Sequence, residues 1–281
     1  MSGRNKPEVP GPIGIFDSGY GGLTIYREIQ ELLPQYDYLY LGDNARTPYG
    51  TRSFDVVYEF TRQCVKYLFS QGCHLVILAC NTASAKALRS IQQVDLPLMA
   101  PARRVLGIIR PTVETIGDVT TSRHIGILAT EGTIKSHSYP LEIQKLYPDI
   151  VVTGEACPMW VPLVETYEHH SAGADFFIKR HIDNLLSRDS QIDTIILGCT
   201  HYPMLIDKIK QFVPPGIKIL TQGAAVASSL KNYLSRHPEM DALCSKGGGR
   251  VFCTTETDNR FREQASRYLE QPIGVEHVVL E

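Results

Sequence analysis

The sequence predicts an α/β protein made of two pseudo-symmetric three-layer domains, each with a mainly parallel central sheet. Short apolar runs alternate with amphipathic stretches from Ile13 to Leu220, a pattern typical of parallel α/β sheets. The 281 residues are enough for two domains of ordinary size. The same order of apolar runs and polar loops also occurs once in each half of the chain. Because ligands of parallel sheets bind beyond the carboxyl ends of the strands, we expect a substrate between the domains.

The expected strands are short apolar runs that open into polar loops. They are Ile13–Phe16, Tyr38–Leu41, Leu75–Ala79, Val105–Ile109, His124–Leu128, Ile150–Val152, Thr194–Leu197, Lys218–Leu220 and, near the end of the chain, Arg250–Cys253. The expected helices are Leu23–Leu33, Phe54–Ser70, Thr133–Leu146, Met159–His169, Ala172–Leu186, Pro203–Phe212 and Ala224–Ser235. The second helix has the clearest ends, since Ser53 is a good N-cap and Gly72 a good residue to follow a helix.

Two sequence patterns each occur once in the first half and once in the second half of the chain, in the same order. The apolar run that opens into a glycine-containing loop at Gly14–Gly19 returns at Gly126–Gly132, 112 residues further on. An apolar strand that ends in a cysteine occurs at Cys80 and again at Cys199, 119 residues further on. The near agreement of the two offsets indicates two halves of similar architecture, each with one cysteine at the same point.

These two cysteines are candidate acid–base groups. Cys80 is followed by Asn-Thr and Cys199 by Thr-His, and each is expected to precede a helix. The positive end of a helix dipole favours a thiolate, so we expect a lowered thiol pKa at both positions. A buried cysteine is more often a small hydrophobic residue, and that interpretation is kept for Cys64, Cys73 and the two C-terminal cysteines.

Two equivalent thiols suit the inversion of a chiral carbon. One group removes a proton from one face, and the other delivers a proton to the opposite face. Hydroxyls and backbone N–H groups after the strands would bind a carboxylate, and Asp17 would bind an ammonium group or polarise Cys80. The candidate hydroxyls are Ser18, Thr82, Thr130 and Thr200.

Composition and charge exclude several other classes of protein. The formal net charge of −2 gives no sign of a nucleic-acid binder, and no apolar run is long enough for a membrane span. The segment 1–12 lacks the apolar stretch of a signal peptide, so a flexible tail and a cytoplasmic protein are expected. An odd count of seven cysteines argues against a disulfide framework, and their spacing matches no usual zinc pattern. The loop after the first strand begins like a dinucleotide-binding turn, but Thr24 replaces its third glycine.

Six motifs together resemble the glutamate racemases of the aspartate/glutamate racemase superfamily. They are Asp17-Ser18-Gly19, the loop 41–50, Cys80-Asn81-Thr82-Ala83-Ser84, the loop 129–134, the segment 156–165 and Gly198-Cys199-Thr200-His201-Tyr202-Pro203. The resemblance covers residues 13–227. It implies that Cys80 and Cys199 exchange the α-proton on opposite faces, that Asp17 assists Cys80, and that His201 and Glu165 assist Cys199. Substrate contacts are implied for Asp17, Ser18, Tyr49, Gly50, Asn81, Thr82, Thr200 and His201.

The resemblance also implies architecture and context. It implies a first domain of residues 13–102 plus 217–281, a second domain of residues 103–216, and a homodimer. No pyridoxal phosphate or metal is implied, and the D-glutamate formed would feed peptidoglycan synthesis. The chain departs from the family pattern at Arg110-Pro111-Thr112, where Glu-Pro-Gly is common, and at Thr221-Gln222-Gly223, where Asp-Ser/Pro-Gly is common. Two alternatives stay open, namely a racemase for another amino acid such as aspartate and a non-catalytic binding protein.

Overall fold

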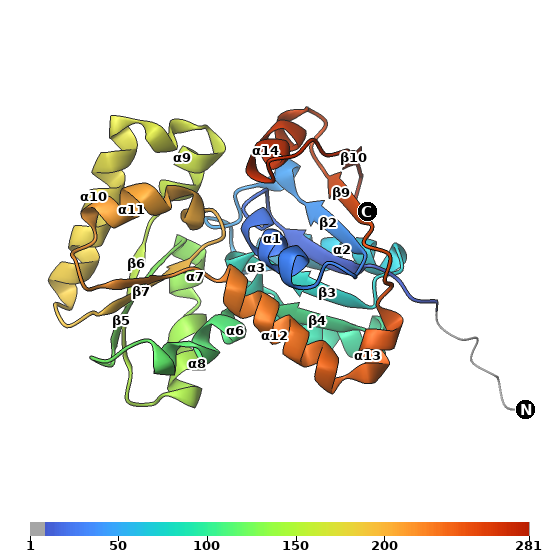
Figure 1. Ribbon diagram of the computed structural model, residues 1–281, viewed down its shortest axis with the longest axis horizontal. Helices are drawn as coiled ribbons and strands as arrows, with labels where there is room; N and C mark the ends of the chain where they lie inside the picture. Colours follow the sequence, from blue (N-terminus) through green and yellow to red (C-terminus); the bar gives the residue numbers. More distant parts are fainter. Residues whose placement is uncertain (1–8, 281) are drawn as a thin grey trace, which may run out of the picture.

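The computed structural model describes residues 9–280 and contains two sheets that lie side by side along the longest axis of the molecule (Figure 1). The chain builds most of the first sheet, crosses to build the second, and then returns to the first. Every strand pairing in the described residues is parallel. The predicted fold class, two α/β halves with parallel central sheets, is confirmed.

The first sheet has the strand order β10-β9-β2-β1-β3-β4, and the second has the order β6-β5-β7-β8. The strands of the first sheet are β1 (Ile13–Asp17), β2 (Tyr38–Gly42), β3 (Leu75–Leu78), β4 (Arg104–Gly107), β9 (Arg250–Thr254) and β10 (Glu276–His277). The strands of the second sheet are β5 (His124–Ala129), β6 (Val151–Ala156), β7 (Thr194–Gly198) and β8 (Lys218–Leu220). The order β2-β1-β3-β4 therefore repeats as β6-β5-β7-β8.

The repeat extends to the register of the strands. Leu78 on β3 pairs with Phe16 on β1, and Leu197 on β7 pairs with Leu128 on β5. Strands β3 and β7, which lead to Cys80 and Cys199, thus each pair with the first strand of their own half. The cysteine follows two residues after the paired leucine in both halves. The internal duplication inferred from the sequence therefore corresponds to two sheets of the same strand order.

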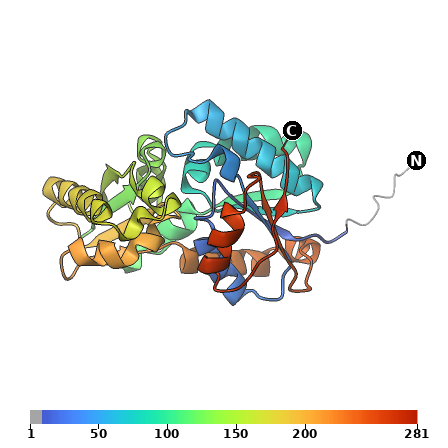
Figure 2. The ribbon, with the colours of Figure 1, turned by 90° about the horizontal axis from the view of Figure 1, so that it is seen from above.

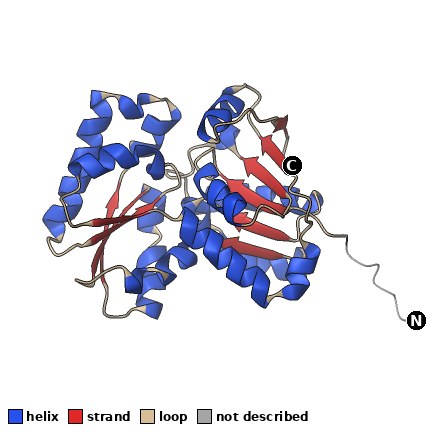
Figure 3. Cartoon of the chain, viewed as in Figure 1, coloured by secondary structure: helices blue, strands red, loops and turns tan. Residues whose placement is uncertain are grey.

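Helices cover both faces of each sheet, as the secondary-structure colouring shows (Figure 3). Around the first sheet they are α1 (Leu23–Leu32), α2 (Phe54–Ser70), α3 (Asn81–Lys86), α4 (Leu88–Ser90), the π-helical η2 (Ile91–Asp95), α5 (Leu96–Met99), α12 (Gly223–Arg236), α13 (Pro238–Leu243) and α14 (Arg260–Tyr268). Around the second sheet they are α6 (Ile109–Glu114), α7 (Glu131–Lys135), α8 (Ser138–Leu146), α9 (Trp160–Glu165), α10 (Ala172–Arg188) and α11 (Ile206–Phe212). Short 3₁₀ turns are η1 (Asn44–Arg46), η3 (Ile116–Asp118), η4 (Glu168–His170) and η5 (Tyr202–Leu205).

The first sheet is buried on both faces, which explains its nearly continuous apolar strands. Seen from above, α2 lies on one face and α1, α12 and α14 lie on the other (Figure 2). The neighbours Ile15 and Phe16 on β1 accordingly belong to different apolar clusters, because successive strand residues point to opposite faces. In the part of the chain that the structure describes, no helix is long and apolar enough to cross a bilayer.

Several boundaries differ from those expected. The predicted helix Thr133–Leu146 is two helices, because the chain turns at His137, whose φ is +54°. The predicted domain boundaries lay at residues 103 and 217, just before β4 and β8. In the structure β4 belongs to the first sheet and β8 to the second, so the chain passes from one sheet to the other after these strands rather than before them. Of the expected tail 1–12, residues 1–8 lie outside the described residues. Gly11 is hydrogen-bonded to Leu243 and Ser245, so the end of that segment is held against the first domain.

Candidate active site

A cavity lies between the two halves, at the carboxyl ends of β1, β3, β5 and β7. It contains about 550 Å³ of space when its open mouth is included, a volume typical of small-ligand sites. Both candidate thiols line it. The other predicted residues that line it are Ser18, Tyr49, Gly50, Asn81, Thr82, Thr130, Thr200 and His201.

Two predicted residues lie behind this wall, and several lining residues were not predicted. Asp17 and Glu165 do not line the cavity, but both contact residues that do. The unpredicted lining residues are Thr47, Pro48, Thr51, Glu131, Pro158, Val161 and Pro162. All of them lie inside or next to loops that the sequence analysis had marked, so proximity to a marked loop was the available signal.

Cys80 is the N-cap residue of α3, and its sulfur is surrounded by hydrogen-bond donors and acceptors. The sulfur accepts a hydrogen bond from Ala83 N at 3.5 Å and donates one to Ser18 Oγ at 3.4 Å. Burial nevertheless raises the pKa of Cys80 to about 12, and the nearby negative charge of Asp17 adds to the rise. The expected lowering of this thiol pKa was therefore wrong, because loss of hydration outweighs the dipole of a short helix. Burial therefore favours the neutral thiol form of Cys80.

Asp17 is fully buried at the end of β1, behind Ser18. Its carboxylate accepts hydrogen bonds from Gly19 N at 3.0 Å and from Thr200 Oγ1 at 3.4 Å. Burial raises the pKa of Asp17, and the charge of His201 and the N–H groups of Gly22 and Gly19 oppose that rise. The aspartate therefore joins the two halves through Thr200 and sets the charge beside Cys80.

Cys199 follows β7 and stands beside a buried histidine. The distance from Cys199 Sγ to His201 Nδ1 is 4.0 Å, and His201 Nε2 lies 2.6 Å from Glu165 Oε1. Burial alone would lower the pKa of His201, but the hydrogen bonds to Cys199 and Glu165 outweigh it and raise that pKa well above its ordinary value. A positively charged imidazole is therefore the neighbour of Cys199, whereas a carboxylate is the neighbour of Cys80.

The loop after β1 packs directly on this histidine. A Cβ atom at Gly21 would lie 2.4 Å from His201 Nδ1, so only glycine allows the approach. The ring of Tyr20 meets the His201 ring edge-on, with centroids 5.3 Å apart, and its hydroxyl donates to Val164 O at 2.7 Å. The first half thus holds the buried histidine of the second in place.

Hydroxyls and backbone groups also join the two halves at the cavity. Thr82 Oγ1 lies 2.9 Å from Thr130 Oγ1, and Gly132 N donates to Gly50 O at 2.8 Å. Thr130 is also the N-cap of α7, accepting from Thr133 N. These hydroxyls and N–H groups form a polar wall that suits the carboxylates of a small ligand.

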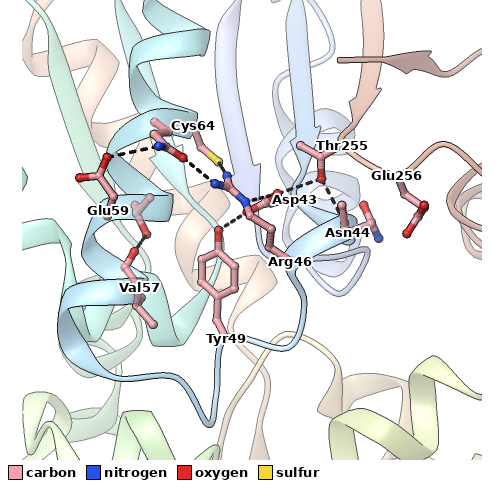
Figure 4. A network of polar contacts seen from close by, with 12 residues as sticks. Asp43, Asn44, Arg46, Tyr49, Val57, Glu59, Cys64, Thr255 and Glu256 are labelled. Carbon is pink, nitrogen blue, oxygen red and sulfur yellow. Dashed lines mark hydrogen bonds and ion pairs between the residues drawn. The ribbon is translucent and has the colours of Figure 1, made fainter. Parts of the chain in front are cut away.

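A polar network behind the cavity holds the loop that contributes Tyr49 and Gly50 (Figure 4). Asp43, which is fully buried, accepts hydrogen bonds from Arg46 Nε at 2.7 Å and from the hydroxyls of Tyr49 and Thr255. The Arg46 guanidinium continues the network to Gln63 and to Cys64 Sγ. The peptide between Thr47 and Pro48 is cis. The network ties the loop that contains Tyr49 and Gly50 to α2 and to the segment after β9.

The other features considered in the sequence analysis lie elsewhere. Among residues 9–280, no group of three or more His, Cys, Asp or Glu side chains gathers in a way that could hold a metal ion. The cysteines apart from Cys80 and Cys199 are buried and free, and none of them lines the cavity.

Two parallel α/β halves of the same strand order, each presenting a cysteine to one shared cavity, define an isomerase of the racemase class. Comparison with protein-family models agrees: the model for Asp/Glu/hydantoin racemases matches residues 13–230. The chain belongs to this family.

Individual relatives are similar over nearly their whole length. A glutamate racemase of Ruegeria sp. (strain TM1040) is 38% identical, with 94% of this chain and 98% of the relative covered. The crystal structure of a glutamate racemase isoform from Bacillus anthracis superposes with a TM-score of 0.86 at 33% identity, covering 96% of this chain and 98% of that one. The glutamate racemase of Francisella tularensis, solved in complex with D-glutamate, has a TM-score of 0.83 at 31% identity, covering 97% and 98%.

Proposed function

We propose that this protein is a glutamate racemase that interconverts L- and D-glutamate by proton transfer between two thiols, without a cofactor. The observation that carries the proposal is the placement of Cys80 and Cys199 on the wall of one cavity, each at the end of an equivalent strand. Relatives with more than a third of their residues identical are glutamate racemases, which supports glutamate as the substrate.

The reaction requires one base and one acid on opposite faces of the α-carbon. In one direction the Cys199 thiolate takes the α-proton, and the Cys80 thiol gives its proton to the other face. The product leaves with Cys199 as a thiol and Cys80 as a thiolate, which is the starting state for the reverse direction. Each turnover therefore breaks one C–H bond and forms one, with no net oxidation.

Charges around the cavity favour this starting state. The imidazolium of His201 is the electrostatic partner that a negatively charged Cys199 needs, and Glu165 holds the ring in place. The buried Cys80 remains protonated until the substrate supplies a cation. The ammonium group of a bound amino acid, drawn toward Asp17, favours the Cys80 thiolate when the reaction runs backward. Fixed dipoles from Asn81, Thr82 and neighbouring hydroxyls stabilise the carbanion-like transition state.

The proposal extends to the setting of the enzyme. D-Glutamate is a peptidoglycan precursor, so the protein would act in the cytoplasm and supply cell-wall synthesis. It would work as a homodimer of chains that each contain two domains, with β4 in the first domain and β8 in the second.

The test is proton exchange in deuterated water. The purified protein is incubated with L- or D-glutamate, and circular dichroism follows inversion while mass spectrometry follows deuterium at the α-carbon. We expect inversion in both directions with one deuterium per inverted molecule. L-Aspartate is assayed in parallel, and faster inversion of aspartate would replace glutamate as the substrate. Binding without exchange would show a non-catalytic protein.

Single variants test the two-thiol assignment. Cys80→Ala and Cys199→Ala should each abolish inversion in both directions and leave the thermal melting temperature close to that of the wild type. Cys253→Ala removes a buried thiol outside the cavity and serves as the matched control. Either active-site variant retaining near wild-type turnover would contradict the assignment.

A further inference from the structure

Gln222 is a buried amide at the junction of the two halves, immediately before α12. Its Oε1 accepts a hydrogen bond from Asn81 Nδ2 at 2.6 Å. Its Nε2 lies within donating distance of Asn81 Oδ1 at 3.1 Å, Tyr139 OH at 2.8 Å and Thr112 Oγ1 at 3.1 Å. The side chain therefore connects the residue next to Cys80 with helices α6 and α8.

The groups around Asn81 determine which end of its amide points where. Its Oδ1 is surrounded by two donors, since Tyr139 OH also donates to it at 2.8 Å. Its Nδ2 faces one acceptor, the Oε1 atom of Gln222. Turning the Asn81 amide over alone would place its NH₂ group against Gln222 Nε2 and its oxygen against Gln222 Oε1. Gln222 is itself oriented by Ile108 O, which can only accept and lies 3.5 Å from Nε2. Gln222 thus favours this orientation of Asn81, with which the Tyr139 hydroxyl is compatible because it can donate or accept.

That orientation leaves one donor for a ligand. The Asn81 side chain lines the cavity. One Nδ2 hydrogen is donated to Gln222, and the second has no acceptor among the side chains and backbone groups of residues 9–280. A free N–H group at the wall of a polar cavity is suited to a carboxylate oxygen.

The arrangement also includes Thr112 of α6, which contacts the Gln222 amide. The two side chains contact each other, because Thr112 Oγ1 accepts from Gln222 Nε2 and donates its own proton to Ile108 O at 2.9 Å. Thr112 and Gln222 therefore form one hydrogen-bonded unit between α6 and the start of α12.

We propose that Gln222 is a positioning residue that holds the Asn81 amide with an N–H group toward the substrate carboxylate. Thr112 and Tyr139 hold Gln222 in turn, so the orientation of Asn81 depends on contacts from both halves of the molecule. The carboxylate is that of glutamate, and to that extent the inference rests on the proposed function. Gln222 does not line the cavity, so it would act through Asn81.

The first test replaces Gln222 with a residue of the same shape that cannot form these bonds. Gln222→Met should raise KM for both enantiomers about tenfold and change kcat by less than about twofold, because a contact made equally in the ground and transition states is weakened. Since enantiomers have equal free energies, kcat/KM must fall by the same factor in both directions. Calorimetric binding of D-glutamate should weaken by a similar factor. Gln264→Met, a buried glutamine of α14 outside the cavity, is the matched control and should leave KM unchanged.

A double-mutant cycle tests whether Thr112 acts through Gln222. Thr112→Val should raise KM about threefold, Thr112→Ser should restore it, and Gln222→Met/Thr112→Val should cost no more than Gln222→Met alone. Tyr139→Phe, which removes only a hydroxyl, should also raise KM, and it carries the test if Gln222→Met does not fold.

Three outcomes would overturn the inference. One is a Gln222→Met variant that keeps KM within twofold of the wild type while Asn81→Ala raises it more than tenfold. Another is a Gln264→Met variant with the same effect as Gln222→Met. The third is full additivity in the cycle. If the wild type inverts glutamate and Gln222→Met does so equally well, this inference fails but the proposed function stands. If the wild type neither binds nor inverts glutamate, the proposed function fails as well.

Discussion

Replacing Glu165 with glutamine should shift the pH dependence of the reaction. Glu165 Oε1 lies 2.6 Å from His201 Nε2, and the His201 side chain is only 3% exposed. A hydrogen bond to a charged group contributes about 1.5–3 kcal/mol, and one pKa unit corresponds to about 1.4 kcal/mol. Loss of the carboxylate should therefore lower the pKa of His201 by about one to two units.

The assay is the pH profile of kcat/KM for both enantiomers between about pH 6 and about pH 10. If the imidazolium form of His201 supports the Cys199 thiolate, the alkaline limb of the Glu165→Gln profile moves to lower pH by the same one to two units. Glu155→Gln is the matched control, because Glu155 pairs with the buried His181 at 2.7 Å outside the cavity. An alkaline limb that stays in place, or that moves equally in both variants, would refute the reasoning.

Glu165→Gln should also change how the stability of the fold depends on pH. The pKa of His201 is raised in the folded protein, so its ion pair stabilises the fold fully below the ordinary histidine pKa of about 6.5. That contribution disappears as the pH rises through the raised value. The difference in urea unfolding free energy between wild type and Glu165→Gln should therefore be largest near about pH 6 and shrink at alkaline pH. A difference that grows with pH would contradict the assigned protonation state.

Three further perturbations have defined outcomes. Asp43→Ala should lower the unfolding free energy measured in urea by about 3 kcal/mol, because Arg46 loses its buried carboxylate partner. An unchanged unfolding free energy would show that the network adds no stability. Gly21→Ala should lower kcat about a hundredfold in the racemisation assay, because the new methyl group displaces His201, and wild-type kcat would show that the loop yields freely. Adding a chelator or pyridoxal phosphate should leave the rate of inversion unchanged, and strong inhibition by the chelator would point to a metal.

The sequence was sufficient for the parts of the fold that local patterns encode. Helix α2 has the predicted ends, because Ser53 accepts from Val56 N and Gly72 takes a positive φ after the last turn. The duplication was visible because both apolar strands end in a cysteine. The break at His137 was not visible, since an amphipathic pattern continues through it and only the packing of α7 and α8 sets the turn.

Contacts between distant parts of the chain were beyond sequence reasoning. Thr255 donates to Asp43 from more than two hundred residues away, and nothing in either segment indicates its partner. Gln222 likewise reaches Asn81 across 141 residues. The pKa of Cys80 was missed for a related reason. Its position before a helix was predicted, but the burial that raises its pKa is produced by both halves of the molecule together.

The duplication provides two thiols, but the reaction requires that they differ at any moment. The same strand order places Cys80 and Cys199 at equivalent points, so the backbone does not distinguish them. Their neighbours do, because the buried carboxylate of Asp17 adds to the raised pKa of Cys80, whereas Cys199 stands beside His201, whose own pKa is raised well above its ordinary value. A symmetric pair of neighbours would leave one shared proton equally placed on either sulfur, so nothing would decide which thiol is the acid and which is the base. In the proposed two-base mechanism, the asymmetry of the side chains on a symmetric scaffold therefore sets which thiol starts as the base and which as the acid.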